Sequence, residues 1–458
     1  MRKEKDSLGA MEVPDEAYYG ASTARSLKNF DVAGATLPRE IIHAIARLKW
    51  ACCQANLELG LLPADKAEAI ILACQRVLSG ALDGQFPLDV FQAGSGTSSN
   101  MNVNEVLAGL ANEALGRKRG DRQGVHPNDD VNKGQSTNNI FPSAIKLACI
   151  ALAAPALASL GELIRELQQK GAEFSDVLKS GRTHLQDAVP VTLGQEFDAW
   201  AQALRKDVLR IQTARGRLYE IGAGGNAIGT GVNTPREFRP AIARALSVLT
   251  GETYRPADNG LEVTQFMTDL ADFSSALRLT AMDINKICND LRLLASGPNT
   301  GFNEVVLPAV EPGSSIMPGK INPGICEAAN MACLQIMGHD HTVSLACGAG
   351  QLELNTHMPA IGYNLVTMLH LLDRCCRMLA ARCIAGVAAN RAVCRRHLEA
   401  SLGLPTILNP RLGYDRVAEL VKEARATGRT LRELVLEKHL LSEPEFEALL
   451  QSATGPNL

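Results

Sequence analysis

Residues 313–323, with the sequence GSSIMPGKINP, gather hydroxyl, lysine and amide side chains between glycines and prolines. The glycines permit a mobile loop, whereas Pro318 and Pro323 stiffen parts of it. Lys320 and Asn322 then offer a cation and an amide that point the same way, and Glu327 follows just beyond. The segment is a candidate binding loop, with an ordinary surface turn as the alternative.

A second polar cluster, GSGTSSN, occupies residues 94–100 and precedes an expected helix start. Small residues around Ser95 and Thr97 expose backbone N–H groups and hydroxyls, and the N-terminus of a helix carries partial positive charge. A carboxylate would be stabilised there. The alternative is a Ser or Thr cap on an ordinary helix.

Nearly every side chain of residues 126–139, HPNDDVNKGQSTNN, can donate or accept a hydrogen bond. Such density is unusual for a turn and indicates a polar site. A solvated loop is the alternative, with His126 either an exposed anion ligand or without a role. The candidate residues in this cluster are His126, Asn128, Asp129, Ser136, Thr137 and Asn138.

The fourth cluster, residues 181–188, places Thr183 beside His184 between two expected long helices. His184 can bind or activate a small polar group if a carboxylate elsewhere tunes its proton affinity. A buried histidine with satisfied hydrogen bonds is the alternative.

Charge, composition and cysteine placement exclude several classes. Lys and Arg number 46 against 49 Asp and Glu, so no general charge favours nucleic acid or an anionic membrane. The start of the chain lacks the apolar stretch of a secretory signal, and no uninterrupted apolar run reaches about 18 to 20 residues. We therefore expect a soluble, cytoplasmic protein.

The twelve cysteines include the adjacent pairs Cys52–Cys53 and Cys375–Cys376, and most lie in helical sequence. This placement fits a reducing cytoplasm better than a disulfide framework. No CxxC and no Cys/His set with zinc spacing occurs, so we expect no metal and no cofactor.

Long helices must position the four polar clusters. Residues 261–296 contain no Gly and no Pro and repeat apolar side chains at threes and fours, which predicts one helix. Helical patterns also cover residues 144–174, 195–219 and 361–388. Few residues are aromatic (4%), and no βαβ rhythm or GxGxxG occurs. We predict a mainly α protein with a central bundle. Its expected domains are an N-terminal helical domain (1–132), a long-helix bundle (133–390) and a small C-terminal helical domain (391–458).

In order and spacing, the four clusters resemble the aspartase/fumarase superfamily. GSSIMPGKIN at residues 313–322 matches the family motif GSSxMPxKxN. The resemblance covers essentially the whole chain, through EAYYGASTARSLKNF near the start, GGNAIGTGVNTP at 224–235, NDLRLLASGP at 289–298 and GQLELN at 350–355.

The resemblance implies catalytic and binding roles. Ser314 resembles the serine that, as an oxyanion, abstracts the proton beside a carboxylate, and Lys320 and Asn322 resemble the groups that hold that carboxylate. Thr183 and His184 complete the site, with Glu327 as the partner that charges His184. The pocket for the second carboxylate and the leaving group would comprise Ser95, Thr97, Ser136, Thr137 and Asn138. A secondary dicarboxylate site would comprise His126, Asn128 and Asp129.

The chemistry accounts for these residue types. Removing a proton beside a carboxylate leaves an aci-carboxylate dianion, so preorganised donors such as Lys320 and Asn322 must dominate catalysis. A serine hydroxyl is a poor base at neutral pH, so backbone donors and nearby positive charge must stabilise its alkoxide. A loop that closes over substrate would also exclude water and strengthen these interactions.

The resemblance further implies a homotetramer whose helices form a common core and whose active sites each draw on three chains. It indicates elimination of ammonia from L-aspartate to give fumarate, because QSTN at 135–138 and GQLELN are aspartase-like. The alternative is reversible hydration of fumarate to malate, because Ser95 and HPNDD are fumarase-like. A non-catalytic structural or ligand-sensing oligomer is the alternative of another class. Asn139 and Asn299 each replace a charged residue that the family usually has.

Overall fold

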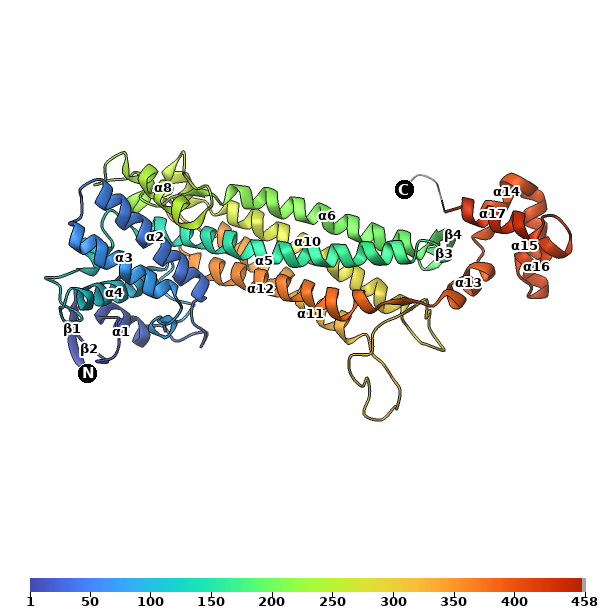
Figure 1. Cartoon of the computed structure of the whole chain (residues 1–458), viewed down its shortest axis with the longest axis horizontal. Helices are drawn as coiled ribbons and strands as arrows, with labels where there is room; N and C mark the ends of the chain where they lie inside the picture. The colour runs from blue at the N-terminus through green and yellow to red at the C-terminus, as the bar shows by residue number, and fades with distance from the viewer. Residues whose placement is uncertain (455–458) are drawn as a thin grey trace. The chain divides into compact units, whose positions relative to one another are not determined.

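The computed structural model describes residues 1–454 and confirms the mainly α class (Figure 1). The chain divides into two compact units. Unit one comprises residues 1–156, 209–279 and 335–372, and unit two comprises residues 157–208, 280–334 and the chain from Asp373 onwards. The three-segment division expected from the sequence stays a prediction.

Five long helices each contribute residues to both units. They are α5 (Thr137–Glu173), α6 (Leu193–Arg217), α10 (Thr268–Leu294), α11 (Gly324–Gly348) and α12 (Met358–Arg382). In unit one, α5 and α10 are joined by an ion pair of 2.9 Å between Lys146 and Asp269. In unit two, the Asn330 amide of α11 donates to Asn285 Oδ1 of α10 at 2.7 Å. The long helices therefore contact one another in each unit, and a single central bundle over residues 133–390 stays a prediction.

Helix α5 is longer and more apolar than the sequence prediction allowed. By length and composition alone it could cross a membrane. In an apolar stretch of 18 residues within this helix, 56% of the residues are buried inside the protein, and a core helix of a soluble protein can have the same length and composition. One such helix is weak evidence for a membrane span.

The single helix predicted for residues 261–296 is wrong. Helix α9 (Gly260–Gln265) ends before Phe266, whose φ of −101° and ψ of 125° are extended, and α10 begins at Thr268. The Phe266 side chain is 60% exposed, so its burial contributes little free energy that would favour a continuous helix at this position. Because no Gly or Pro marks this break, the sequence pattern concealed it.

Unit one also contains short strands and shorter helices. They are β1 (Arg2–Asp6), β2 (Gly9–Val13), α1 (Ala21–Asn29), α2 (Arg39–Glu58), α3 (Ala64–Leu78), η1 (Asp83–Gln85), α4 (Thr97–Ala114), the π-helix η2 (Pro127–Val131), β5 (Glu220–Ile221), α7 (Asn226–Gly229), α8 (Phe238–Thr250) and β6 (Arg255–Pro256). Strands β1 and β2 are antiparallel, and β5 and β6 are parallel.

Unit two adds short strands and the C-terminal helices. They are β3 (Leu178–Thr183), β4 (Gln186–Thr192), β7 (Val305–Val306), η3 (Ile384–Gly386), β8 (Ala388–Ala389), α13 (Arg391–Ala400), α14 (Leu404–Leu412), α15 (Tyr414–Thr427), α16 (Leu431–Glu437) and α17 (Glu443–Ser452). Helices α13 to α17 share their own core, in which Leu408, Leu434 and Phe446 are buried, and Leu178 of β3 packs against it. This core contributes to holding β3 in place.

The Thr183–His184 cluster lies in a β-hairpin that the sequence analysis did not predict. Strands β3 and β4 pair antiparallel, with Leu178 opposite Thr192 and Thr183 opposite Gln186. His184 and Leu185 form the two-residue connection. The catalytic candidates of this cluster are therefore presented on the tip of a hairpin rather than on a loop between helices.

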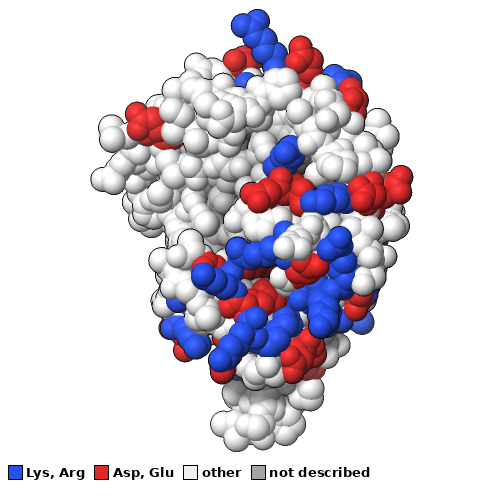
Figure 2. All heavy atoms as spheres, turned by 90° about the vertical axis from the view of Figure 1, so that its left-hand side faces the viewer, with Lys and Arg blue, Asp and Glu red and all other residues white. Residues whose placement is uncertain are grey.

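Side chains on the surface and in the core agree with the composition. Figure 2 shows Lys and Arg interspersed with Asp and Glu on one face, as the nearly balanced charges predict. All twelve cysteines are free thiols, and only Cys347 is partly exposed. Their buried positions fit the prediction that they are not a disulfide framework.

Candidate active site

The Ser314 loop presents a hydroxyl that accepts two backbone hydrogen bonds. The N–H groups of Ile316 and Met317 donate to Ser314 Oγ at 3.2 and 3.0 Å. Such short-range serine turns arise because the side-chain oxygen lies close to the N–H groups two and three residues on. Both donors would stabilise negative charge on Ser314 Oγ, as a serine alkoxide that acts as a base requires.

The base of the same loop is closed by two hydrogen bonds. The Gly313 N–H donates to the Lys320 carbonyl at 2.9 Å, and Asn322 Nδ2 donates to the Gly313 carbonyl at 2.7 Å. A Cβ at Gly313 would lie 2.5 Å from the Lys320 carbonyl oxygen, so this close approach requires glycine. The Lys320 side chain is exposed. In this conformation Asn322 holds the loop, and its role in carboxylate binding stays a prediction.

Glu327 and His184 lie in unit two, without a hydrogen bond or ion pair joining them in the described residues. Glu327 occupies the first turn of α11, and its nearest cationic group is Arg292, at 3.9 Å. His184 is exposed at the hairpin tip, where its φ is 56° and that of Leu185 is 57°. Their pairing stays a prediction.

The first polar cluster forms the start of α4, as predicted, although the helix begins earlier than expected, at Thr97. Ser95 Oγ and Thr97 Oγ1 are hydrogen-bonded at 2.8 Å. Gly96 has a φ of 82°, and a Cβ there would lie 2.2 Å from the Phe141 ring. The turn that brings the two hydroxyls to the helix N-terminus therefore requires glycine at position 96.

The structure brings the first and second clusters together in unit one. Asn100 Nδ2 of α4 donates to Oγ1 of Thr137, the first residue of α5, at 3.0 Å. Ser136 Oγ accepts from the Asn138 N–H at 3.3 Å. Asn138 Nδ2 donates to the Ala227 carbonyl at 2.8 Å, so Asn138 Oδ1 is left as the acceptor.

Lys49 organises this pair of clusters, and the sequence analysis missed it. Its side chain is fully buried, and Nζ donates to Asn132 Oδ1 at 2.7 Å and to Gln135 Oε1 at 2.9 Å. Asn132 Oδ1 also accepts from Asn100 at 3.4 Å and Asn104 at 3.3 Å. Burial lowers the pKa of Lys49 to about 7. A lone lysine within an apolar helical pattern was the signal that could have identified it.

The predicted secondary dicarboxylate site forms a compact turn. His126 Nδ1 accepts from the N–H groups of Asn128 and Asp129 at 3.2 and 3.1 Å. Asp129 Oδ2 also lies 3.3 Å from the same ring nitrogen. The three predicted residues are therefore together, and anion binding by them stays a prediction.

The two departures from the family pattern differ in environment. Asn139 is buried and donates through Nδ2 to Thr264 Oγ1 at 2.7 Å, while its Oδ1 is buried without a hydrogen-bond partner in the described part of the chain. Asn299 is exposed. A change of charge at position 139 would therefore perturb the protein interior at the start of α5 more than one at position 299.

A buried cluster of charges lies behind the hairpin that carries His184. Glu304 is fully buried and accepts from Arg182 Nη1 and Nη2 at 3.0 and 2.7 Å. Lys179 Nζ lies 3.2 Å from Glu304 and 2.8 Å from Glu196. Burial raises the pKa of Glu304, but the hydrogen bond from Arg182 and the charge of Lys179 outweigh it, so that pKa lies below its ordinary value. The pKa of Glu196 is raised, chiefly by burial.

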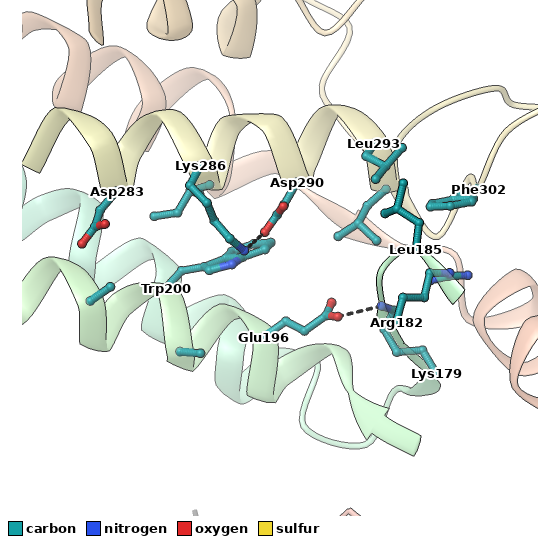
Figure 3. A pocket seen from close by; sticks show the side chains of 14 residues that line it. Lys179, Arg182, Leu185, Glu196, Trp200, Asp283, Lys286, Asp290, Leu293 and Phe302 are labelled. Carbon is teal, nitrogen blue, oxygen red and sulfur yellow. Dashed lines mark hydrogen bonds and ion pairs between the residues drawn. The ribbon is translucent and has the colours of Figure 1, made fainter. Parts of the chain in front are cut away.

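The hairpin also forms one wall of a pocket in unit two, with a volume of about 560 Å³ (Figure 3). Lys179 and Arg182 come from the hairpin, Trp200 from α6 and Lys286 from α10. Lys286 is paired with Asp290. No group of three or more His, Cys, Asp and Glu side chains within residues 1–454 is arranged to hold a metal ion.

Two family models match the chain. The model described as "Lyase" matches residues 9–338, and that described as "Fumarase C C-terminus" matches residues 404–454. The first covers well over half of the chain, so the protein belongs to the aspartase/fumarase superfamily of lyases. The resemblance identified from the four clusters is confirmed.

Individual relatives carry two different names at equal similarity. The chain is 45% identical to an aspartate ammonia-lyase from Pseudomonas fluorescens, over 98% of this chain and 95% of that protein. It is also 45% identical to a class II fumarate hydratase from Thermosynechococcus vestitus, over 97% of this chain and 96% of that protein. Overall identity therefore does not separate the two activities.

Solved structures have the same fold over the whole chain. A fumarate lyase:delta crystallin from Brucella melitensis, bound to cobalt, superposes with a TM-score of 0.96 at 44% identity and covers 99% of this chain and 100% of its own. A class II fumarase from Schistosoma mansoni superposes with a TM-score of 0.95 at 40% identity, covering 100% of both chains.

Proposed function

We propose that the protein eliminates ammonia from L-aspartate to give fumarate, with Ser314 as the base. The observation that carries this proposal is that the backbone N–H groups of Ile316 and Met317 donate hydrogen bonds to Ser314 Oγ, at 3.2 and 3.0 Å. These donors lower the free energy of an alkoxide relative to the neutral hydroxyl, which a serine base requires.

The proposed reaction begins when the Ser314 alkoxide removes a proton from the carbon beside one carboxylate of aspartate. The electron pair moves into that carboxylate and forms an aci-carboxylate dianion, which Lys320 and Asn322 stabilise. Collapse of the dianion forms the double bond of fumarate and breaks the C–N bond at the neighbouring carbon, so that the protonated amino group of the substrate leaves as neutral ammonia. Thr183 and His184 assist this departure, with Glu327 keeping His184 charged.

The second carboxylate and the leaving amino group would occupy the pocket formed by Ser95, Thr97, Ser136, Thr137 and Asn138. Because Asn138 Nδ2 donates to the Ala227 carbonyl, Asn138 Oδ1 is available to accept from an ammonium group. An acceptor at this position suits the ammonium group of aspartate, and it would also accept from the hydroxyl group of malate.

We further propose a cytoplasmic homotetramer in which different chains complete each active site. Met331, Leu334 and Leu345 on α11 are 65%, 60% and 63% exposed, and an apolar helix face of this kind is a candidate for burial between subunits. Assembly would bury these side chains and bring the polar clusters of several chains together.

Reversible hydration of fumarate to malate is the second candidate. It is supported by Ser95, which is fumarase-like, and by the 45% identity to a class II fumarate hydratase. The compact turn of His126, Asn128 and Asp129 would then serve as the secondary dicarboxylate site.

The test follows the ultraviolet absorbance of the fumarate double bond after purified protein is mixed separately with L-aspartate and with L-malate. Formation of fumarate from aspartate alone is the expected result. Formation from malate alone would reverse the assignment to a hydratase. If neither substrate gives fumarate, the result would favour a substrate pocket altered by Asn139 or a non-catalytic role.

A further inference from the structure

The tip of the β3–β4 hairpin has a backbone conformation that its residues do not favour. His184 and Leu185 have φ values of 56° and 57°. Two-residue hairpin connections commonly need positive φ, and Asn and Gly usually supply it. A side chain other than Gly in this region costs on the order of 1–3 kcal/mol and persists only where the surroundings enforce it. An isolated two-stranded hairpin is also only marginally stable. Something outside the tip must therefore hold it.

The groups that hold the hairpin converge on one buried carboxylate. Glu304 accepts hydrogen bonds from Nη1 and Nη2 of Arg182, which is two residues before His184. It also lies 3.2 Å from Lys179, at the other end of β3. The Arg182 guanidinium stacks over the Phe302 ring at 4.3 Å from the ring centroid. Strand β3 is thus fixed to residues 302–304 at two points.

The same carboxylate connects the hairpin to the C-terminal helices. His397 Nδ1 of α13 lies 2.9 Å from Glu304 Oε1. Just after α13, Ser401 Oγ accepts from Ser180 Oγ of β3 at 2.9 Å, and the Leu402 N–H donates to Asp187 Oδ2 of β4 at 3.0 Å. The segment after α13 therefore holds both strands of the hairpin.

We propose that Glu304 is a positioning residue for His184: it anchors the hairpin through Arg182 and Lys179 and connects it to α13 through His397. This assignment rests on the proposed function of His184. The Glu304 side chain is fully buried, so it acts through the residues that it holds rather than on the substrate. It fixes the strand from which the Thr183–His184 tip projects, and the C-terminal helices share in that task.

Removing the charge of Glu304 leaves the cations of Arg182 and Lys179 without their common partner. Lys179 keeps Glu196 at 2.8 Å, so the charge left without a carboxylate is that of Arg182. Removing one partner of a buried ion pair is strongly destabilising, because the remaining charge is uncompensated. Displacement of a catalytic group by about 1 Å can cost on the order of 10²-fold in rate. We therefore expect E304Q to lower kcat by at least about tenfold. KM should stay within about threefold, because Lys320 and Asn322 are on a different loop.

The experiment compares wild type, E304Q, R182K and the control E162Q, which changes an exposed glutamate of α5 in the same unit. Each protein is assayed for kcat and KM with aspartate, and backbone hydrogen–deuterium exchange is measured by mass spectrometry. R182K keeps the charge but loses the two-pronged contact, so it tests the geometry even if E304Q does not fold. The expected result is a lower kcat with faster exchange in residues 178–192 in both variants, and no change in E162Q. In E304Q the faster exchange should extend at most to α13, because His397 of that helix also loses its contact with the Glu304 carboxylate.

A wild-type kcat in a folded E304Q or R182K, or unchanged exchange in residues 178–192, would overturn the proposal. Faster exchange throughout unit two would also overturn it, because Glu304 would then be a general stabilising residue. If wild-type protein turns over neither aspartate nor malate, the proposed function fails. The exchange of residues 178–192 in E304Q and R182K then decides alone whether Glu304 holds the hairpin.

Discussion

Replacing Ser314 with alanine should abolish turnover while leaving substrate binding largely intact. The mutation removes the Oγ atom that accepts from the Ile316 and Met317 N–H groups. It leaves the base of the loop intact, because the Gly313–Lys320 and Asn322–Gly313 hydrogen bonds do not involve the Ser314 side chain. Lys320 should therefore stay in place in S314A.

The size of the expected effect follows from the roles removed. A positioned general base contributes about 10² to 10⁴ in rate, and a donor aimed at a developing oxyanion contributes about 10² to 10³. S314A loses the base, and its two N–H donors lose their target, so we expect kcat to fall by at least about 10³-fold. KM should change by less than about threefold, because the carboxylate-binding groups remain.

The assay measures fumarate formation from aspartate at several concentrations, with S315A as the matched control. Ser315 is the adjacent exposed serine of the same loop, with no hydrogen bond from its hydroxyl in the described residues. S315A should keep kcat within about threefold of wild type, since it removes a hydroxyl but no base. If S314A retained more than about a tenth of the wild-type kcat, Ser314 would not be the base.

Three further predictions concern stability and are read from urea unfolding. The free energy of unfolding of G96A should be about 1–3 kcal/mol lower than that of the control G60A. Both glycines have positive φ, but only the Cβ at position 96 would meet the Phe141 ring. Equal free energies of unfolding for the two variants would contradict the close contact. The pKa of Lys49 is about 7 in the folded protein and ordinary in the unfolded chain, so between pH 7 and 10 only the unfolded chain keeps the proton. The free energy of unfolding of wild type, measured relative to that of K49M, should therefore rise by about 1 kcal/mol per pH unit over this range. A difference independent of pH would show that Lys49 titrates normally. The pKa of Glu304 is lower in the folded protein than its ordinary value of about 4.3 in the unfolded chain. The ionised carboxylate therefore stabilises the fold above a pH of about 4.3, and this stabilisation is lost as pH falls through the folded pKa. The difference in free energy of unfolding between wild type and E304Q should shrink in acid, and a difference that grows in acid would contradict the lowered pKa.

Periodicity and clustering predicted the helical class and the composition of each polar cluster. The GSSIMPGKIN loop precedes a long helix, and GSGT begins one, because small polar residues interrupt apolar patterns at helix starts. The clusters were recognisable because they differ so strongly in composition from the helices around them.

The hairpin and its anchor could not be predicted in the same way. His184 and Leu185 carry no turn signal of the Asn-Gly type. The buried carboxylate that contacts their hairpin, Glu304, lies more than 100 positions further along the chain. Long-range ion pairs leave no local pattern. The break between α9 and α10 was missed for a related reason, since Phe266 is as compatible with a helix as its neighbours.

Local pattern also could not reveal the buried lysine network. Lys49 lies in a helix whose neighbours are apolar, and its acceptors Asn132 and Gln135 are more than 80 positions further along the chain. Only the packed structure shows that one buried lysine contacts the residues before Thr137.

The most direct test of Ser314 as a carbon base is proton NMR of the reverse reaction in D₂O, with fumarate and ammonium as substrates. Wild-type protein should form aspartate carrying one deuterium, with a single stereochemistry, on the carbon that receives the proton, and S314A should form none. Labelled aspartate produced by S314A at the wild-type rate would contradict the account.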